Sequence, residues 1–324
     1  MTPIRIAIIG YGKIARDQHR PAIDADPHFV LTAVVNPVEI ACDVPCFPTI
    51  DALRLSGLTI DAVAICTPPA PRFDLALQAI DAGWDVLLEK PPAATLGAIG
   101  IIQSRAHAAK VSLFVAWHSR FQPAVDVARN TLREARNIAL NIEWFEDVHR
   151  WHPDQRWIWE AGGFGVFDPG INALAIATAV LPDELVIAAS QLEMVSGCQT
   201  PIAADLSFAP TKRLTMGRAR FDWRARETDL WVIRIDTDDM NVELLDGGEL
   251  LLVDGQAVSC EGPAEYPALY ERFATLIDAR SSEVDSEPLR LVADALLVGE
   301  VRAVSPCVPE AQGPSRMDQV GQSS

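Results

Sequence analysis

Short apolar runs alternate with segments of helical periodicity in the first third of the chain. The helix-like segments lie near residues 51–55, 73–82 and 96–109, and the apolar runs span residues 4–9, 29–35, 62–66, 86–88 and 113–116. Strands that alternate with helices form a parallel sheet with right-handed crossovers. The pattern therefore predicts a doubly wound α/β domain over residues 1–120.

The pattern changes in the rest of the chain. Strand-like apolar runs, separated by turn residues such as Asp246-Gly247-Gly248, cover residues 139–144, 186–192, 214–221, 230–236 and 242–253. They predict a mostly antiparallel, open-faced sheet with helices beside it, in a second domain over residues 121–303. Apolar side chains at helical spacing indicate a last packed helix at 288–301. Residues 304–324 are rich in Pro, Gly, Ser and Gln, and we expect them to be disordered.

Composition narrows the range of partners. The 44 acidic residues outnumber the 27 Lys and Arg residues, which gives a net charge of −17. Since no basic cluster offsets this charge, we expect neither nucleic acid nor an anionic membrane as a partner. No apolar stretch approaches the ~20 residues of a membrane span, which predicts a soluble, cytoplasmic protein. The six cysteines are scattered and no histidine stands beside them at metal-ligand spacing, so we expect free thiols and no metal site.

A glycine-rich turn follows the first apolar run. Gly10, Gly12 and Ala15 fit the pattern G-x-G-x-x-[GA], in which the glycines let the backbone turn sharply and approach a pyrophosphate. The helix that follows offers unpaired N–H donors to phosphates. The turn, which also contains Lys13 and Ile14, therefore predicts a dinucleotide site in a Rossmann domain. The ends of the third and fourth strands add the other expected cofactor contacts, which are Thr67, Pro68, Glu89 and Lys90.

The second strand ends at Asn36, where an acidic residue usually binds the adenosine ribose. Asparagine can still hydrogen-bond a ribose hydroxyl. Glu39 would repel a 2′-phosphate, and no Arg or Lys lies nearby in the sequence to neutralise one. We therefore expect NAD as the cofactor, with NADP as the alternative. If Asn36 only shapes a turn, the preference stays open.

Two polar groups are candidate catalytic residues. Lys90 follows the fourth strand, at the carboxyl edge where doubly wound folds bind ligands, and a fixed cation there can stabilise a developing alkoxide. Asp168 and Asn172 are four residues apart, so a helix that begins near Pro169 would point both the same way. Each candidate has an ordinary alternative role, because Lys90 could be a solvated surface charge and Asp168 could be the N-cap of that helix.

Taken together, these motifs make the chain similar to the glucose-fructose oxidoreductase (Gfo/Idh/MocA) family. The resemblance rests on residues 10–15, on Glu89-Lys90-Pro91, and on Gly162-Gly163 followed by Asp168. Within the family the sequence most resembles bacterial galactose and arabinose 1-dehydrogenases, through residues 13–19, 116–120, 151–153 and 167–174. The resemblance extends from the N-terminus to about Val301.

The resemblance implies oxidation of the C1 hydroxyl of a free aldose to an aldonolactone, with hydride transfer to the nicotinamide. In many relatives the residue four positions after the motif aspartate is a histidine base, but here it is Asn172, which cannot take a proton. Asp168 is therefore expected to be the acid/base, Lys90 to stabilise the oxyanion, and Asn172 to donate to the ring or C1 oxygen. The candidates for holding the sugar are His118, Glu146, Trp151 and His152.

The other aromatic and histidine residues have ordinary expected roles. Trp157 and Trp159 are expected in the core or the pocket wall. His19, His28 and His107 are expected at the surface or in local packing.

Two other functions stay open. Certain fungal galactose repressors resemble this family and keep the fold without turnover, so a non-catalytic, NAD-binding sugar sensor is one alternative. The other is a dehydrogenase that acts on an inositol or a nucleotide sugar, against which Asn172 argues weakly. The enzyme is favoured because a lysine and an acid aimed at one carbon serve turnover. Replacing Lys90 or Asp168 by alanine is thus predicted to lower turnover about 10²-fold or more while coenzyme still binds.

The sequence leaves the sugar and the assembly open. D-Galactose, L-arabinose and D-fucose differ only in the substituent at C5, and we expect D-galactose first. Relatives form dimers or tetramers, so we expect a homo-oligomer, with the strands from Leu214 onward as a candidate interface.

Overall fold

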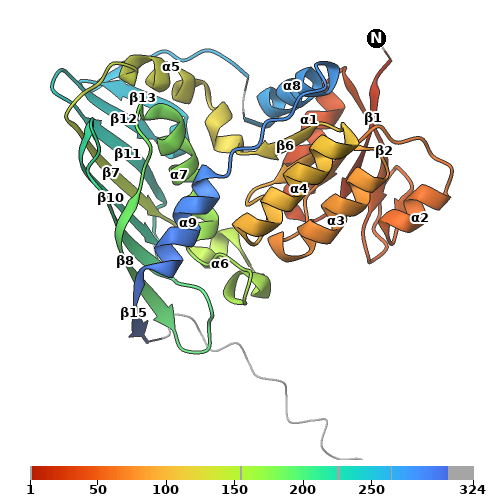
Figure 1. The fold of residues 1–324 in the computed structure, drawn as a ribbon, viewed down its shortest axis with the longest axis horizontal. Coiled ribbons are helices and arrows are strands. Elements are labelled where there is room, and N and C mark those ends of the chain that lie inside the picture. Colours follow the sequence, from red (N-terminus) through yellow and green to blue (C-terminus); the bar gives the residue numbers. More distant parts are fainter. Residues whose placement is uncertain (1, 154, 225–226, 264, 306–324) are drawn as a thin grey trace, which may run out of the picture.

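The computed structural model describes residues 2–305 except 154, 225–226 and 264, and it has two lobes (Figure 1). The N-terminal lobe contains a six-stranded parallel sheet in the order β3-β2-β1-β4-β5-β6, so the predicted doubly wound sheet is confirmed. Its strands are β1 (Ile4–Ile9), β2 (Phe29–Val35), β3 (Cys46–Phe47), β4 (Ala62–Ile65), β5 (Asp85–Glu89) and β6 (Leu113–Ala116). The helices between them are the short π-helix η1 (Ala15–His19), α1 (Arg20–Ala25), α2 (Ile50–Leu55), α3 (Pro69–Asp81) and α4 (Leu96–Ala109).

The central strands of this sheet are short aliphatic runs because both of their faces are covered. Every residue of β4 is fully buried, and each buried aliphatic side chain contributes ~1.5–3 kcal/mol to stability. Since the strands are parallel, their carboxyl ends lie at one edge. Gly10, Thr67 and Lys90, which follow β1, β4 and β5, are thereby brought to that edge.

The C-terminal lobe contains a nine-stranded sheet in the order β14-β13-β12-β11-β7-β10-β9-β8-β15. Most neighbours are antiparallel, as predicted, but β7 with β10 and β8 with β15 run parallel. The strands are β7 (Ile138–Phe145), β8 (Ile187–Val195), β9 (Ala203–Phe208), β10 (Leu214–Asp222), β11 (Leu230–Asp236), β12 (Asn241–Leu245), β13 (Leu250–Val253), β14 (Gln256–Val258) and β15 (Gly299–Val304).

Helices of the C-terminal lobe gather on one face of this sheet (Figure 1). They are η2 (His118–Phe121), α5 (Pro123–Leu132), α6 (Val148–Trp151), η3 (Arg156–Trp159), α7 (Phe167–Val180), η4 (Asp246–Gly248) and α9 (Glu287–Leu297). The strands alternate accordingly, since Leu140 and Ile142 of β7 are buried beneath the helices while Asn141 is exposed. None of the helices in the described part of the chain is both long and apolar enough to cross a membrane.

The last predicted helix was wrong at its C-terminal end. α9 ends at Leu297, and the following residues form β15, an edge strand beside β8. Gly299 packs so closely that an added Cβ would lie 2.5 Å from Leu192, and the chain leaves the helix there. The exposed side chain of Val301 supplied the apolar position that extended the helical pattern. Of the tail expected to be disordered, residues 306–324 lie outside the described residues.

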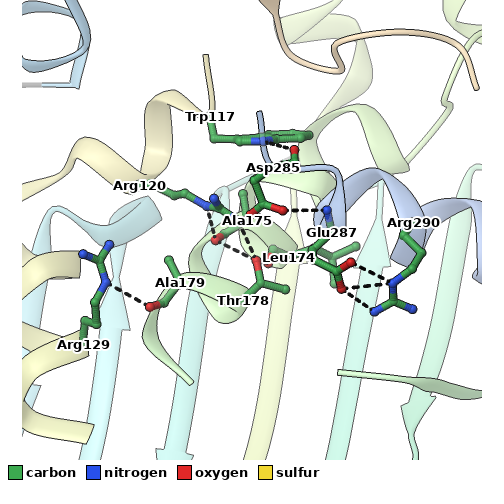
Figure 2. Close-up of polar contacts among 10 residues, drawn as sticks. All are labelled: Trp117, Arg120, Arg129, Leu174, Ala175, Thr178, Ala179, Asp285, Glu287 and Arg290. Atoms are coloured by element: carbon green, nitrogen blue, oxygen red, sulfur yellow. Dashed lines mark hydrogen bonds and ion pairs between the residues drawn. The ribbon is translucent and has the colours of Figure 1, made fainter. Parts of the chain in front are cut away.

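Polar contacts tie together two of the connections that cross between the lobes (Figure 2). One runs from β6 through η2, and the other runs from α8 (Glu265–Asp278) to α9. Trp117 Nε1 donates to the Asp285 carbonyl at 2.9 Å, and Arg120 pairs with the Asp285 carboxylate at 2.6 Å. Arg120 also donates to the carbonyl of Ala175 in α7. Both crossings therefore hold α7 against the N-terminal lobe.

Although α8 lies in the C-terminal half of the sequence, it packs on the N-terminal sheet. It contacts α1, β6 and η2, and Tyr270 and Phe273 join the core beneath β1. In Figure 1 this blue helix lies beside the red α1. The predicted division near residue 120 assigns α8 to the second domain, whereas its packing is with the first sheet.

Candidate active site

The glycine-rich turn leaves room for a pyrophosphate. Gly10 has a φ of 86°, and an added Cβ would lie 2.7 Å from Thr67 Cγ2, so only glycine fits there. A Cβ on Gly12 would have no atom within 4 Å, which leaves open space beside the backbone. The hydroxyl of Thr67 is buried and lacks a hydrogen-bond partner among the described residues. These features fit a bound dinucleotide.

The remaining predicted cofactor residues surround this turn. Ala15 is fully buried in η1, where a small side chain lets the helix pack on the sheet, and Ile14 precedes it. Lys13 is exposed and pairs with Asp17 at 2.5 Å. Pro68 is exposed at the start of α3.

Asn36 does shape a turn, which was the alternative role. Its side-chain oxygen accepts the N–H of Tyr11 at 3.2 Å, and its nitrogen donates to the carbonyl of Val38 at 2.7 Å. These bonds fix the carboxamide next to the glycine-rich turn. The choice between NAD and NADP is not settled by them.

Lys90 and Asp168 meet where the two lobes face each other. Lys90 Nζ lies 2.9 Å from the carbonyl oxygen of Asp168 and 3.5 Å from its carboxylate. Asp168 stands inside the first turn of α7, whose N-cap is Val166, and it makes no capping bond, so the N-cap alternative is wrong. The solvated-charge alternative for Lys90 is also wrong, since its side chain is only 14% exposed. Asn172 lies one turn further along α7 and is half-buried.

Two titratable groups of the C-terminal lobe extend this pair. His152 Nε2 lies 3.5 Å from the Asp168 carboxylate and 3.9 Å from that of Glu146. Burial raises the pKa of Glu146 to about 7, although the hydrogen bond from Trp223 opposes this. Burial also lowers the pKa of His152, against the pull of Asp168. The pKa values of Glu146 and His152 thus move toward one another, which suits these two neighbouring groups to exchange a proton.

The other two predicted sugar-binding residues are anchored by different neighbours. His118 Nδ1 lies 3.1 Å from the carboxylate of Glu265, and its ring stacks on Tyr266. Burial lowers the pKa of His118, but the charge of Glu265 outweighs this and the net pKa is raised. Trp151 donates its Nε1 hydrogen to Asp229 at 3.1 Å. Neither anchor belongs to the Lys90–Asp168 pair.

Glu89 is the centre of a buried network that the sequence did not reveal. Its Oε1 accepts hydrogen bonds from Tyr266 at 2.7 Å and from His19 at 2.9 Å, and its Oε2 accepts the Lys90 N–H at 2.8 Å. Arg72, also buried, donates to the carbonyls of Glu89 and Pro91. Burial raises the pKa of Glu89, but His19 and the nearby cations outweigh burial and hold it well below the usual range.

Sequence reasoning placed His19 wrongly. It was expected at the surface or in local packing, but it is fully buried between Glu89 and Tyr270, far away in sequence. Burial acts against its protonation, yet the neighbouring Cys66 and Glu89 raise its pKa to about 10. His28 and His107 are exposed, and Trp157 and Trp159 pack against the core, as expected.

Trp223, Glu265 and Tyr266 were missed altogether. The helical spacing of Tyr266, Leu269, Tyr270 and Phe273 is the signal that could have revealed α8. No sequence signal links Trp223 to Glu146.

No three of the described His, Cys, Asp and Glu side chains are arranged to hold a metal ion. Lys90 and His152 each lie 3.5 Å from the Asp168 carboxylate.

Comparisons with known proteins agree with this arrangement. Residues 4–117 match a family model described as an oxidoreductase family with an NAD-binding Rossmann fold, GFO_IDH_MocA. The chain is 44% identical to a galactose 1-dehydrogenase of Pseudomonas fluorescens over 302 residues, which cover 92% of this chain and 97% of that protein.

Solved structures give the same result. A D-galactose-1-dehydrogenase from Rhizobium etli superposes with a TM-score of 0.89 at 43% identity, over 94% of this chain and 98% of that one. A 3-ketoreductase from Actinomadura kijaniata, 16% identical with a TM-score of 0.78 over 94% of this chain and 100% of that one, shares the fold. The expected nicotinamide cofactor is confirmed at the level of NAD(P). The chain belongs to the Gfo/Idh/MocA family of oxidoreductases.

Proposed function

We propose that this oxidoreductase removes the C1 hydrogen of a free aldopyranose, D-galactose before L-arabinose or D-fucose, and releases the aldonolactone. The observation that carries the proposal is the meeting of Lys90 Nζ with Asp168 at the carboxyl end of β5, beside the glycine-rich turn. The similarity to two galactose 1-dehydrogenases over nearly the whole chain supports the choice of sugar.

Two different residues of the chain carry out proton transfer and charge stabilisation. When bound, the dinucleotide supplies the acceptor for a hydride. The Asp168 carboxylate accepts the proton of the C1 hydroxyl, and the Lys90 ammonium stabilises the negative charge that develops on that oxygen. His152, 3.5 Å from Asp168, can take the proton onward toward Glu146.

The remaining site residues bind the sugar. Glu146 and His152 hydrogen-bond its hydroxyls, and Trp151 stacks on its apolar face. Against the effect of burial, Glu265 raises the pKa of His118 and so favours the protonated ring, in which Nδ1 donates to Glu265 and Nε2 is left to donate to the substrate. Asn172 donates to the ring or C1 oxygen.

Cofactor preference and assembly complete the proposal. We infer NAD over NADP because Glu39 would repel a 2′-phosphate. We also infer a homo-oligomer, dimer or tetramer, in which the face of the nine-stranded sheet turned away from α5, α7 and α9 meets a second copy (Figure 1). This face is more polar than the sequence suggested, with Asn141, Arg218 and Arg220 on it. The cytoplasmic location stays a prediction.

A panel of sugars with a labelled hydrogen tests the proposed function. The purified protein is mixed with NAD or NADP and with D-galactose, L-arabinose, D-fucose, myo-inositol or a UDP-sugar, and reduced cofactor is followed by absorbance. We expect turnover with the three aldoses and transfer of deuterium from [1-²H]galactose to the cofactor. Turnover confined to inositol or UDP-sugars would contradict the C1 assignment. Cofactor binding without turnover on any sugar would instead favour the sensor.

A further inference from the structure

The first turn of α8 contacts two site residues, although none of its own residues was predicted to bind the cofactor or the sugar. Glu265 and Tyr266 are adjacent in sequence, and each contacts a different site group. The Glu265 carboxylate lies 3.1 Å from His118 Nδ1, and the Tyr266 hydroxyl donates to Glu89 Oε1 at 2.7 Å. No motif in the sequence assigns either residue a role.

The contact through Glu89 bears directly on Lys90. The Glu89 side chain is 3% exposed, and its second oxygen accepts the backbone N–H of Lys90 at 2.8 Å. The carboxylate therefore connects the hydroxyl of Tyr266 to the backbone from which the catalytic ammonium extends. Because a lysine side chain has four rotatable carbon–carbon bonds, its aim at Asp168 depends on a backbone held in one position.

The contact through Glu265 acts on His118. The imidazole is stacked on the Tyr266 ring, with centroids 5.3 Å apart and planes 18° apart, while Glu265 engages Nδ1. A carboxylate on one ring nitrogen fixes the tautomer and the orientation of the other. One helical turn thus fixes the plane, the rotation and the protonated nitrogen of this ring.

We propose that Glu265 and Tyr266 are positioning residues for the reaction, Tyr266 acting on Lys90 through Glu89 and Glu265 acting on the sugar through His118. The inference rests on the proposed function for its kinetic consequences, but the contacts themselves are independent of the substrate. A purely structural helix would lower the apparent kcat through the amount of folded protein and would leave KM unchanged, to the same extent in any variant of equal stability. The contact of Tyr266 with Glu89 should instead affect kcat, and the contact of Glu265 with His118 should affect KM for the sugar.

The kinetic test compares three conservative variants in the full-length protein. Tyr266→Phe removes one hydroxyl and keeps the ring, and we expect kcat to fall about 10-fold with KM for the sugar changed less than about 2-fold. Glu265→Gln should raise KM for the sugar about 5-fold or more and leave kcat within about 2-fold. Ser112→Ala is the matched control, since its buried hydroxyl donates to the carbonyl of Leu276 in the same helix at 3.3 Å and contacts neither Glu89 nor His118. It should lose comparable stability yet keep kcat within about 2-fold.

A second readout does not require turnover. Lys90 is labelled with a short pulse of acetic anhydride and quantified by mass spectrometry, with exposed Lys212 as the internal reference. We expect at least about 3-fold faster labelling of Lys90 in Tyr266→Phe and no change in Ser112→Ala. If no sugar is oxidised, the proposed function fails, and labelling alone decides the role of Tyr266. Unchanged labelling in Tyr266→Phe, or equal losses of kcat in Tyr266→Phe and Ser112→Ala, would overturn the proposal.

Discussion

The two lobes hold their charged groups at the site in different ways. On the N-terminal side, both oxygens of Glu89 are satisfied by hydrogen bonds of 2.7–2.9 Å, and Lys90 follows directly in the chain. On the C-terminal side, Asp168, His152 and Glu146 stand 3.5–3.9 Å apart. A tightly bonded network fixes a charge, whereas more widely spaced groups, two of which (Glu146 and His152) have shifted pKa values, can pass a proton between them. The comparison teaches that one lobe supplies a fixed cation and the other supplies the proton acceptor.

The largest expected effect on turnover comes from replacing either the fixed cation, Lys90, or the proton acceptor, Asp168. Lys90→Met keeps the unbranched stem of the side chain without the charged amine, and Asp168→Asn keeps the shape without the basic oxygen. Each should lower kcat about 10²-fold or more, because each removes charge stabilisation or proton transfer in the transition state. Initial rates measure this, and quenching of tryptophan fluorescence by the dinucleotide shows that the cofactor still binds. Near-normal turnover in both variants would refute the assignment.

The raised pKa of Glu146 gives a second test of the difference between the two lobes, through the pH dependence of stability. Burial raises its pKa from 4.5 to about 7, so the folded state holds a proton that the unfolded state has lost between these values. The contribution to stability is complete below pH 4.5 and is lost as pH rises through 7. This shift amounts to at most about 3 kcal/mol.

Glu146→Gln removes this titration and keeps an oxygen for the Trp223 hydrogen bond. The free energy of unfolding in urea, measured from pH 4.5 to 8, should therefore fall more steeply in the wild type than in the variant. Parallel pH profiles would show that Glu146 keeps an ordinary pKa in the folded protein.

Breaking the ion pair between Arg120 and Asp285, which joins two of the connections between the lobes, should have a smaller effect on stability. Arg120→Met removes the cation that pairs with the Asp285 carboxylate and one of the two side-chain donors to the Ala175 carbonyl. We expect a loss of about 2 kcal/mol in the free energy of unfolding. Arg129→Met is the matched control. Its exposed side chain also donates to a carbonyl of α7, that of Ala179, and its loss should cost under about 0.5 kcal/mol. Equal losses in the two variants would mean that the Arg120–Asp285 ion pair, drawn in Figure 2, contributes no more to stability than the exposed Arg129 contact.

The smallest expected effect concerns the cofactor. Asn36→Asp keeps an oxygen for the N–H of Tyr11 and adds a charge beside the ribose. We expect kcat/KM for NAD relative to NADP to rise about 10-fold, through ribose binding and repulsion of the 2′-phosphate. An unchanged ratio would mean that Asn36 serves only the turn.

The sequence predicted what local pattern determines. The alternation of strands and helices determines the parallel sheet, so the sequence alone places Gly10, Thr67 and Lys90 at one edge of it. The spacing of Asp168 and Asn172 likewise predicted that both lie on one helix, and they do, in α7.

What the sequence could not predict depends on long-range contacts. His19 meets Tyr270 across 251 positions, and Glu89 meets Tyr266 across 177. Periodicity identifies the face of a helix, but it does not identify the strand end that a polar group on that face will reach. For the same reason the pattern extends the last helix into residues 299–301 of β15, since only the register beside β8 reveals an edge strand.

A double variant tests most directly the claim that Lys90 and Asp168 act as one unit on a single sugar oxygen. The measurement is the single-turnover rate of cofactor reduction with D-galactose in Lys90→Met, in Asp168→Asn and in the combination. If the pair acts as a unit, the combination falls little below the slower single variant, because the first change already removes what the second supported. Two penalties that multiply to about 10⁴-fold would contradict the account, since the groups would then act independently.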